Sequence, residues 1–219
     1  MSANASPLWH HFQDLRQQHE AVTLGMWMFL TTEVLVFGGL FTGYIVYRLS
    51  YSEAFEEGSR QLSIRIAATN TAVLLTSSLT MVLAVRSAQL GSPRDTALWL
   101  AGTALLGIVF LAIKFGEYAL DYHESLVPQL AFREDWQSNR AHVQLFFTFY
   151  YSLTGLHALH MVVGISIVGV LAILAARGTY SADYYAPVEA WGLYWHFVDI
   201  VWIFLLPLLY LIGTRGSGH

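Results

Sequence analysis

The sequence contains no cysteine. This absence excludes disulfides, thiolate zinc sites, cysteinyl iron–sulfur clusters, covalently attached c-type haem and thiolate-bridged copper centres. Any metal ion would have to be bound by histidine and carboxylate side chains.

Charged residues are also scarce. They make up 12% of the 219 residues, whereas hydrophobic residues make up 55%, and the mean hydropathy is +0.48. The 11 basic and 15 acidic side chains are too few to cover the surface of a soluble protein of this length. The net charge of -4 leaves no basic patch for phosphate groups, so we expect no nucleic acid as a partner.

The sequence contains long hydrophobic stretches with few or no charged residues. A helix needs about 20 apolar residues to cross the hydrocarbon core of a membrane, and helices are the spanning elements that fit such stretches. We therefore predict an all-α integral membrane bundle of five transmembrane helices, at residues 24–47, 66–85, 96–113, 141–176 and 190–214. Residues 24–214 form this membrane domain. They are flanked by a polar N-terminal segment, 1–23, which we expect to be uncleaved, and by a C-terminal tail, 215–219.

The segments between the hydrophobic stretches are expected to be loops. Residues 48–65 are rich in charge, and residues 121–140 mix both signs of charge around Pro128. Gly91-Ser92-Pro93 is a cluster of residues that break helices.

One carboxylate lies near the middle of the first stretch. Glu33 follows its start by about nine residues, and an ionised carboxylate at this depth must face protein, or else it stays protonated. Two interpretations remain open. Glu33 is either a proton- or lipid-linked carboxyl or a protonated side chain that hydrogen-bonds to a neighbouring helix.

The last two stretches also contain polar residues. His157 and His160 are three residues apart and share a helix face, and His196 and Asp199 repeat that spacing. Such groups on several helices could in principle bind a metal. Interhelical hydrogen bonds that fix the register of the helices are the favoured interpretation. His157 and His160 are too close together for the stacked haems of a cytochrome b.

Other residues suggest packing rather than chemistry. Trp195 and Trp202 share a helix face with Asp199, and we expect them to be packing or interface aromatics. Lys114 and Glu117 are three residues apart at the end of the third stretch and are expected to pair at the membrane interface. The remaining candidates, expected to be solvated, are His10, His11 and His19.

Several segments resemble subunit III of the haem-copper oxidases. The run from Tyr194 to Trp202, Tyr-Trp-His-Phe-Val-Asp-Ile-Val-Trp, resembles the last-helix motif of that family. The Thr-Gly-Leu-His-Ala-Leu-His run within residues 149–164 resembles its Thr-Gly-x-His-x-x-His helix. Residues 25–37 resemble its helix with a buried glutamate, and residues 115–118 resemble its Glu-Tyr segment more loosely. Many members have seven spans, and five spans are similar to the short bacterial form.

The resemblance implies an accessory subunit without a catalytic centre of its own. No cofactor is expected in this chain, because haem and copper belong to the partner subunits I and II, and bound phospholipid is expected. The chain would support proton uptake and the stability of the catalytic subunit. The resemblance implies Glu33 as the buried family glutamate and His160, His196 and Asp199 as matching polar positions.

Two arguments about orientation disagree. The resemblance places the chain in the bacterial inner membrane with its N-terminus in the cytoplasm and its C-terminus outside. Counting Lys and Arg gives the opposite, with seven on the C-terminal side and four on the other. We follow the resemblance, because a specific motif outweighs a margin of three residues.

Alternative functions remain at this point. An accessory subunit of a quinol oxidase or of a nitric oxide reductase would have the same architecture. A stand-alone small transporter that uses Glu33 and Asp199 is disfavoured, because the sequence shows no internal repeat of the transporter kind.

Overall fold

The computed structural model describes residues 12–128 and 130–213. In these ranges five helices are long and apolar enough to cross a membrane: α1 (Leu15–Ser50), α3 (Ile64–Gln89), α4 (Pro93–His123), α5 (Arg140–Ala176) and α6 (Ala186–Tyr210). The predicted bundle of five helices is therefore confirmed. A short helix, α2 (Ser52–Gln61), and two paired strands, β1 (Leu126–Val127) and β2 (Ala131–Phe132), complete the described chain. His10, His11 and the tail 215–219 lie outside it.

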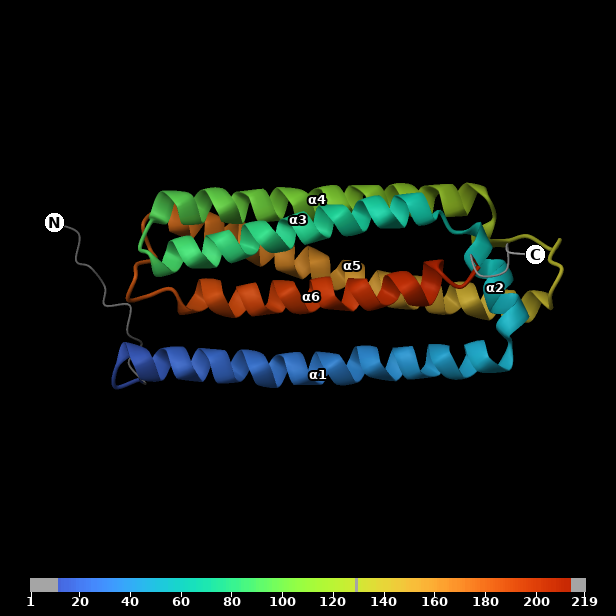
Figure 1. The fold of residues 1–219 in the computed structure, drawn as a ribbon, viewed down its shortest axis with the longest axis horizontal. Coiled ribbons are helices and arrows are strands. Elements are labelled where there is room, and N and C mark those ends of the chain that lie inside the picture. Colours follow the sequence, from blue (N-terminus) through green and yellow to red (C-terminus); the bar gives the residue numbers. More distant parts are fainter. Residues whose placement is uncertain (1–11, 129, 214–219) are drawn as a thin grey trace.

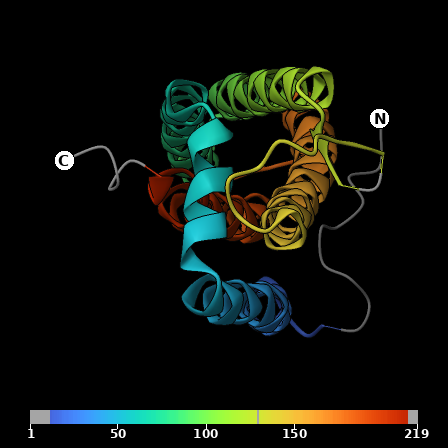
Figure 2. The same cartoon turned by 90° about the vertical axis from the view of Figure 1, so that its right-hand side faces the viewer.

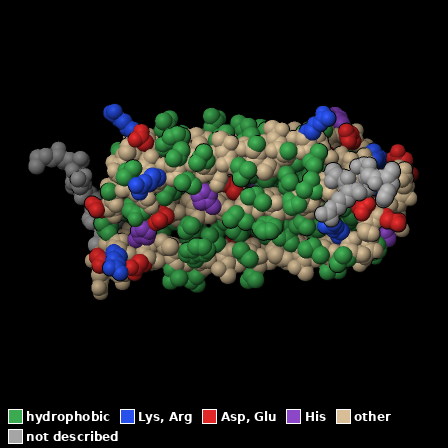
Figure 3. Space-filling model, in the orientation of Figure 1, with side chains coloured by type: hydrophobic (Ala, Val, Ile, Leu, Met, Phe, Trp, Pro, Cys, Tyr) green, Lys and Arg blue, Asp and Glu red, His purple; other side chains and the backbone are tan. Residues whose placement is uncertain are grey.

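The long helices run side by side and alternate in direction (Figure 1). Seen end-on, α3, α4, α5 and α6 surround a common core, whereas α1 lies along one side and α2 crosses the end of the bundle (Figure 2). Charged side chains gather at the two ends, and hydrophobic side chains fill the band between them (Figure 3). We call the two ends the α2 end and the Gly91 end, after the turn between α3 and α4.

The prediction of loops is partly wrong for two segments, 48–65 and 121–140. Residues 48–65 contain α2, which buries Ala54, Phe55, Gly58 and Ser59 on one face, while its charged side chains lie on the other. The third long helix continues to His123, ten residues beyond the predicted end at 113. It does so because Lys114, Glu117 and Asp121 point into the bundle, where other side chains bind them.

The core depends on close contact between α4, α5 and α6. Trp195 and Trp202 of α6 are each 1% exposed. A Cβ at Gly107 of α4 would lie 2.8 Å from the Trp195 ring and 2.8 Å from Ile165 of α5. Glycine is therefore needed at position 107 to admit the indole ring between the helices.

The α2 helix is fastened to the rest of the α2 end by hydrogen bonds. The Ser59 hydroxyl donates to the Leu209 carbonyl at 2.7 Å and accepts from the Gly213 N–H at 3.2 Å. The Glu57 carboxylate accepts from the backbone N–H groups of Gln137 and Ser138, at 2.8 Å each. Burial acts to raise the pKa of Glu57, but these hydrogen bonds outweigh it and hold the pKa below the ordinary value.

We predict that Gly107→Ala destabilises the bundle, because the added methyl group must displace the Trp195 ring or Ile165. Overpacking of this kind typically costs about 1 to 3 kcal/mol. The measurement is thermal unfolding of the detergent-solubilised protein. Gly102→Ala on the same helix is the matched control, since nothing lies within 4 Å of the added Cβ. Equal midpoints for the two variants would contradict the prediction.

A second prediction concerns acid. The pKa of Glu57 is lower in the folded protein than in the unfolded chain, so its stabilising contribution is present above the unfolded value of about 4.3. The contribution is lost as the pH falls through the folded value. Hydrogen exchange, corrected for intrinsic rates, should show the Gln137 and Ser138 amides losing protection in acid. Glu57→Gln should lower their protection at neutral pH and flatten this dependence, whereas Glu53→Gln, on the exposed face of α2, should not. A flat profile in the wild type would refute the proposed role of Glu57.

Candidate functional site

Glu33 and His160 meet between α1 and α5. The Glu33 Oε2 lies 3.0 Å from His160 Nε2, and the side chains are 16% and 12% exposed. The ring of Phe37 lies 5.3 Å from the imidazole, and the Tyr194 hydroxyl donates to the His160 carbonyl at 2.9 Å. The pair thus joins α1 to α5 in the middle of the hydrophobic band.

The hydrogen bonds of His160 determine what this pair can do. Its Nδ1 lies 2.8 Å from the Leu156 carbonyl, which can only accept, so Nδ1 carries a proton. The contact between Nε2 and Glu33 then requires one further proton, held by either the carboxyl or the imidazole. The pair is neutral as a whole in both states, and it can hold or shift one proton without leaving a net charge in the membrane.

A larger polar cluster lies inside the bundle, nearer the α2 end. The Lys114 Nζ donates to Glu117 at 2.8 Å, to the Tyr150 hydroxyl at 3.0 Å and to the Tyr210 hydroxyl at 2.7 Å. Tyr210 also donates to Glu117 at 2.9 Å, and Tyr150 donates to Asp121 at 3.1 Å. We call these five residues the Lys114 cluster; they come from α4, α5 and α6.

Aromatic rings complete the surroundings of the lysine. The ammonium lies 4.6 to 5.6 Å from the centres of four rings: Tyr118, Tyr150, Trp202 and Tyr210. The Lys114 and Glu117 side chains are 2% and 4% exposed. The expected Lys114–Glu117 pair is therefore present, but it lies in the interior rather than at the membrane interface.

The spacing of three charged residues in the sequence indicates part of this cluster. Lys114, Glu117 and Asp121 are separated by three and four residues, so they share one face of a helix. The tyrosine partners carried no such signal. Tyr150 and Tyr210 are distant in sequence, and only the packing of the three helices brings them together.

Three residues predicted to be polar sites lie in different surroundings. His157 lies between the rings of Phe110 and Trp202, and neither of its nitrogens has a hydrogen-bond partner among the described residues. His196 Nδ1 lies 2.8 Å from the Ser78 hydroxyl of α3. Asp199 is 4% exposed, and neither carboxylate oxygen has a hydrogen-bond partner in the described structure. His196 and Asp199 thus share a helix face but are not paired with each other.

The two tryptophans are buried side chains of the bundle and do not lie at the water interface. The Trp195 indole N–H donates to Ser77 at 3.1 Å, and that of Trp202 donates to Thr71 at 3.0 Å. Both partners lie on α3. Both tryptophans are therefore packed inside the bundle, and they are not the interface aromatics that we expected as the alternative.

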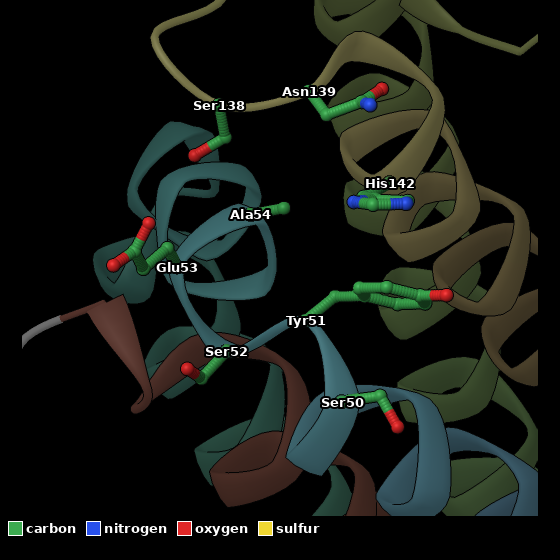
Figure 4. A pocket seen from close by; sticks show the side chains of 8 residues that line it. All are labelled: Ser50, Tyr51, Ser52, Glu53, Ala54, Ser138, Asn139 and His142. Carbon is green, nitrogen blue, oxygen red and sulfur yellow. The ribbon is translucent and has the colours of Figure 1, made fainter.

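Two further features lie at the ends of the molecule: a polar contact at one end and a cavity at the other. At the Gly91 end His19 Nε2 lies 2.6 Å from Glu189, so His19 is not simply solvated as expected. At the α2 end a cavity of about 370 Å³ separates the start of α2 from the start of α5 (Figure 4). There the His142 ring stacks on Tyr51 with 3.7 Å between centres.

Among the described residues, no three His, Asp or Glu side chains gather in a way that could hold a metal ion.

The family is identified by comparison with known proteins. A family model described as cytochrome c oxidase subunit III matches residues 10–214, nearly the whole chain. The chain belongs to the cytochrome c oxidase subunit III family. It is a multi-pass membrane protein and an accessory subunit III of a haem-copper oxidase, with no catalytic centre of its own.

Individual relatives cover most of the chain. It is 33% identical over 204 residues to cytochrome c oxidase subunit 3 of Synechocystis sp., covering 93% of this chain and 78% of that one. It is 30% identical over 213 residues to cytochrome bo(3) ubiquinol oxidase subunit 3 of Pseudomonas aeruginosa, covering 97% and 95%. It is also 30% identical over 195 residues to a probable quinol oxidase subunit 3 of Staphylococcus saprophyticus, covering 89% and 90%.

We predict that Lys114→Met strongly destabilises this subunit III, because it leaves the Glu117 carboxylate buried without its cation. Breaking a buried pair in this way typically costs about 3 to 5 kcal/mol. The double variant Lys114→Met/Glu117→Gln should recover part of the loss, since no unpaired charge remains at position 117. The measurement is a double-mutant cycle of thermal unfolding.

The control for this cycle is the exposed pair of α1. Arg16 and Glu20 lie 2.9 Å apart with side chains 87% and 66% exposed, so Arg16→Met should leave the unfolding midpoint unchanged. A double variant less stable than Lys114→Met would show that the buried charge is not the cause of the loss.

Proposed function

We propose that this subunit III packs against catalytic subunit I, in a complex that also contains subunit II, and sustains proton uptake and the lifetime of the catalytic subunit. The observation that carries the proposal is the Glu33–His160 pair, which holds a proton-bearing contact between α1 and α5 in the middle of the membrane. The Lys114 cluster supports it, because it fixes α4, α5 and α6 as a rigid wall. Such a wall limits the rearrangement of water and lipid beside a proton entrance.

Phospholipid is proposed as a bound component. An apolar cavity of about 500 Å³ lies at the Gly91 end between α1 and α6, lined by Val22, Met26, Pro187, Ala190 and Trp191 among others. Its apolar lining suits an acyl chain, and its place near the charged end suits a lipid whose headgroup stays at the surface.

The proposed location is the bacterial cytoplasmic membrane, with the N-terminus in the cytoplasm and the C-terminus outside. The family resemblance supports this orientation. Burial of Lys114 weakens the opposing argument, because a lysine inside the bundle does not act as a loop charge. Without it, the count that favours the opposite orientation falls from seven residues to six against four.

The test is to purify the oxidase complex with and without this chain. We expect the complex without it to take up protons more slowly and to lose activity after fewer turnovers. Turnover, proton pumping and the decay of activity during sustained turnover are measured. Equal values for both preparations would overturn the proposal. Reduced-minus-oxidised spectra of the same preparations identify the haems of the partner subunits.

We also predict the effect of substitutions at Glu33. Glu33→Gln should leave assembly largely intact, because the amide keeps the volume of the carboxyl and can donate to His160 Nε2. Glu33→Ala leaves the imidazole without its partner, at a cost of about 1 to 3 kcal/mol, and should lower the fraction of subunit III retained by the complex. Glu20→Gln, on the exposed face of α1, is the control. Normal assembly of the Gln variant with strongly reduced turnover would show that proton transfer at Glu33, rather than structure alone, is required.

A further inference from the structure

Asp199 is the starting point, because the described structure gives its carboxyl group no hydrogen bond. It lies about halfway along α6, is 4% exposed, and both oxygens lack a partner. The Lys114 cluster and the Glu33–His160 pair show that this fold satisfies its other buried carboxylates. A buried polar group without a protein partner in a polar site is commonly solvated by ordered water.

A line of polar groups leads from Asp199 toward the Gly91 end. The Ser78 hydroxyl of α3 interacts with the Asp199 carboxyl without meeting the geometry of a hydrogen bond. The same hydroxyl lies 2.8 Å from His196 Nδ1, and His196 precedes Asp199 by one helical turn. His196 is only partly buried and lines a groove of about 410 Å³ between α3 and α6.

The groove connects the hydrophobic band with the charged end of the molecule. Its lining includes Arg86, Gln89 and Glu189 together with apolar side chains such as Val82 and Leu193. The imidazole therefore has one nitrogen on the partly buried serine, while its ring borders a groove that reaches the charged end of the molecule.

Two large side chains flank Asp199 along α6. Trp195 and Trp202 lie one turn before and one turn after it on α6, each 1% exposed and each hydrogen-bonded to α3. The titratable or charged groups of α3 and α6 along the open direction are His196, Arg86 and Glu189, and Glu189 also pairs with His19 of α1.

We infer that the groove between α3 and α6 is a hydrated inlet, and that His196 and Ser78 relay protons between its water and the carboxyl group of Asp199. In the outward direction the Asp199 O–H transfers its proton through the water that solvates it to Ser78 Oγ, the Ser78 hydroxyl proton moves to His196 Nδ1, and the Nε2 proton leaves to groove water. The carboxylate gains the electron pair of its broken O–H bond, and the imidazole ends as its other neutral tautomer. Return of a proton by the same steps in reverse restores both groups, so no other reactant is needed.

The inference concerns side chains of this chain alone and does not depend on the proposed role in proton uptake. The experiment is hydrogen–deuterium exchange followed by infrared spectroscopy of the intact purified complex. The spectrum of wild type minus Asp199→Asn isolates the carbonyl stretch of the protonated Asp199. On transfer to deuterated buffer we expect this band to shift rapidly in the wild type.

Matched variants locate the route. Ser78→Ala and His196→Phe should each slow the shift of the Asp199 band at least about tenfold, whereas Ser166→Ala should leave it unchanged. Ser166 is a suitable control because, within the part of the chain that the structure describes, its hydroxyl bonds the Val162 carbonyl of its own helix. Ser78→Ala alone decides the test if His196→Phe does not assemble.

Three results would overturn the inference. One is a wild-type spectrum from which Asp199→Asn removes no carboxyl band, which would mean that Asp199 carries no proton. Another is a band that does not shift in deuterated buffer, as expected if a lipid chain fills the groove and keeps it dry. The third is a rapid shift that Ser78→Ala does not slow, which would place the route elsewhere.

Discussion

The structure depends above all on the placement of one buried cation. Lys114 carries a positive charge inside a membrane bundle, and such a charge is tolerated only if its donors are all satisfied. Its partners are Glu117 on its own helix, Tyr150 on α5 and Tyr210 on α6. A shift of any of these helices along its axis by one turn, about 5.4 Å, would separate the ammonium from a partner. The cluster therefore selects one register among the many that apolar surfaces alone would allow.

The attachment of α1 follows a different principle. This helix exposes large side chains along most of its length, and few of its residues are buried. Its polar connections to the long helices are spread from one end to the other: His19 to Glu189, Glu33 to His160, and the Tyr44 hydroxyl to the Leu208 carbonyl. The α1 helix is thus held at separate points rather than along a continuous core, which leaves room beside it for lipid.

The sequence predicts the long helices well because the signal is strong at every turn. Stretches without charge leave no other spanning structure for a chain in a membrane. It predicts less well where charge and burial coincide. The third hydrophobic stretch ends at 113 and a loop is expected from Asp121, yet α4 continues to His123 because side chains of α5 and α6 bind Lys114 and Asp121. The α2 helix was missed because its buried face is small and its composition is polar.

The candidate site shows the same division. The helical spacing identified Glu33, His160, His196 and Asp199 as polar residues within the membrane, but spacing along one helix does not identify partners on another. Hence His196 and Asp199 share a helix face but have different surroundings. His196 is hydrogen-bonded to Ser78, whereas the Asp199 carboxyl has no hydrogen bond in the described structure. Ser78 has no feature that distinguishes it in the sequence from Ser77, which accepts from Trp195 instead.

The contacts of Ser59 have a consequence for biogenesis. This residue of α2 bonds Leu209 and Gly213, which are about 150 residues later in the chain. During synthesis α2 reaches the surface of the membrane long before its partners exist, and contacts so distant in sequence form late. These two bonds can form only after α6 has been inserted, and Tyr210 of the Lys114 cluster arrives with that same helix. The Ser59 bonds at the α2 end and the Tyr210 bonds of the Lys114 cluster therefore both wait for α6, so that a chain interrupted before α6 has neither.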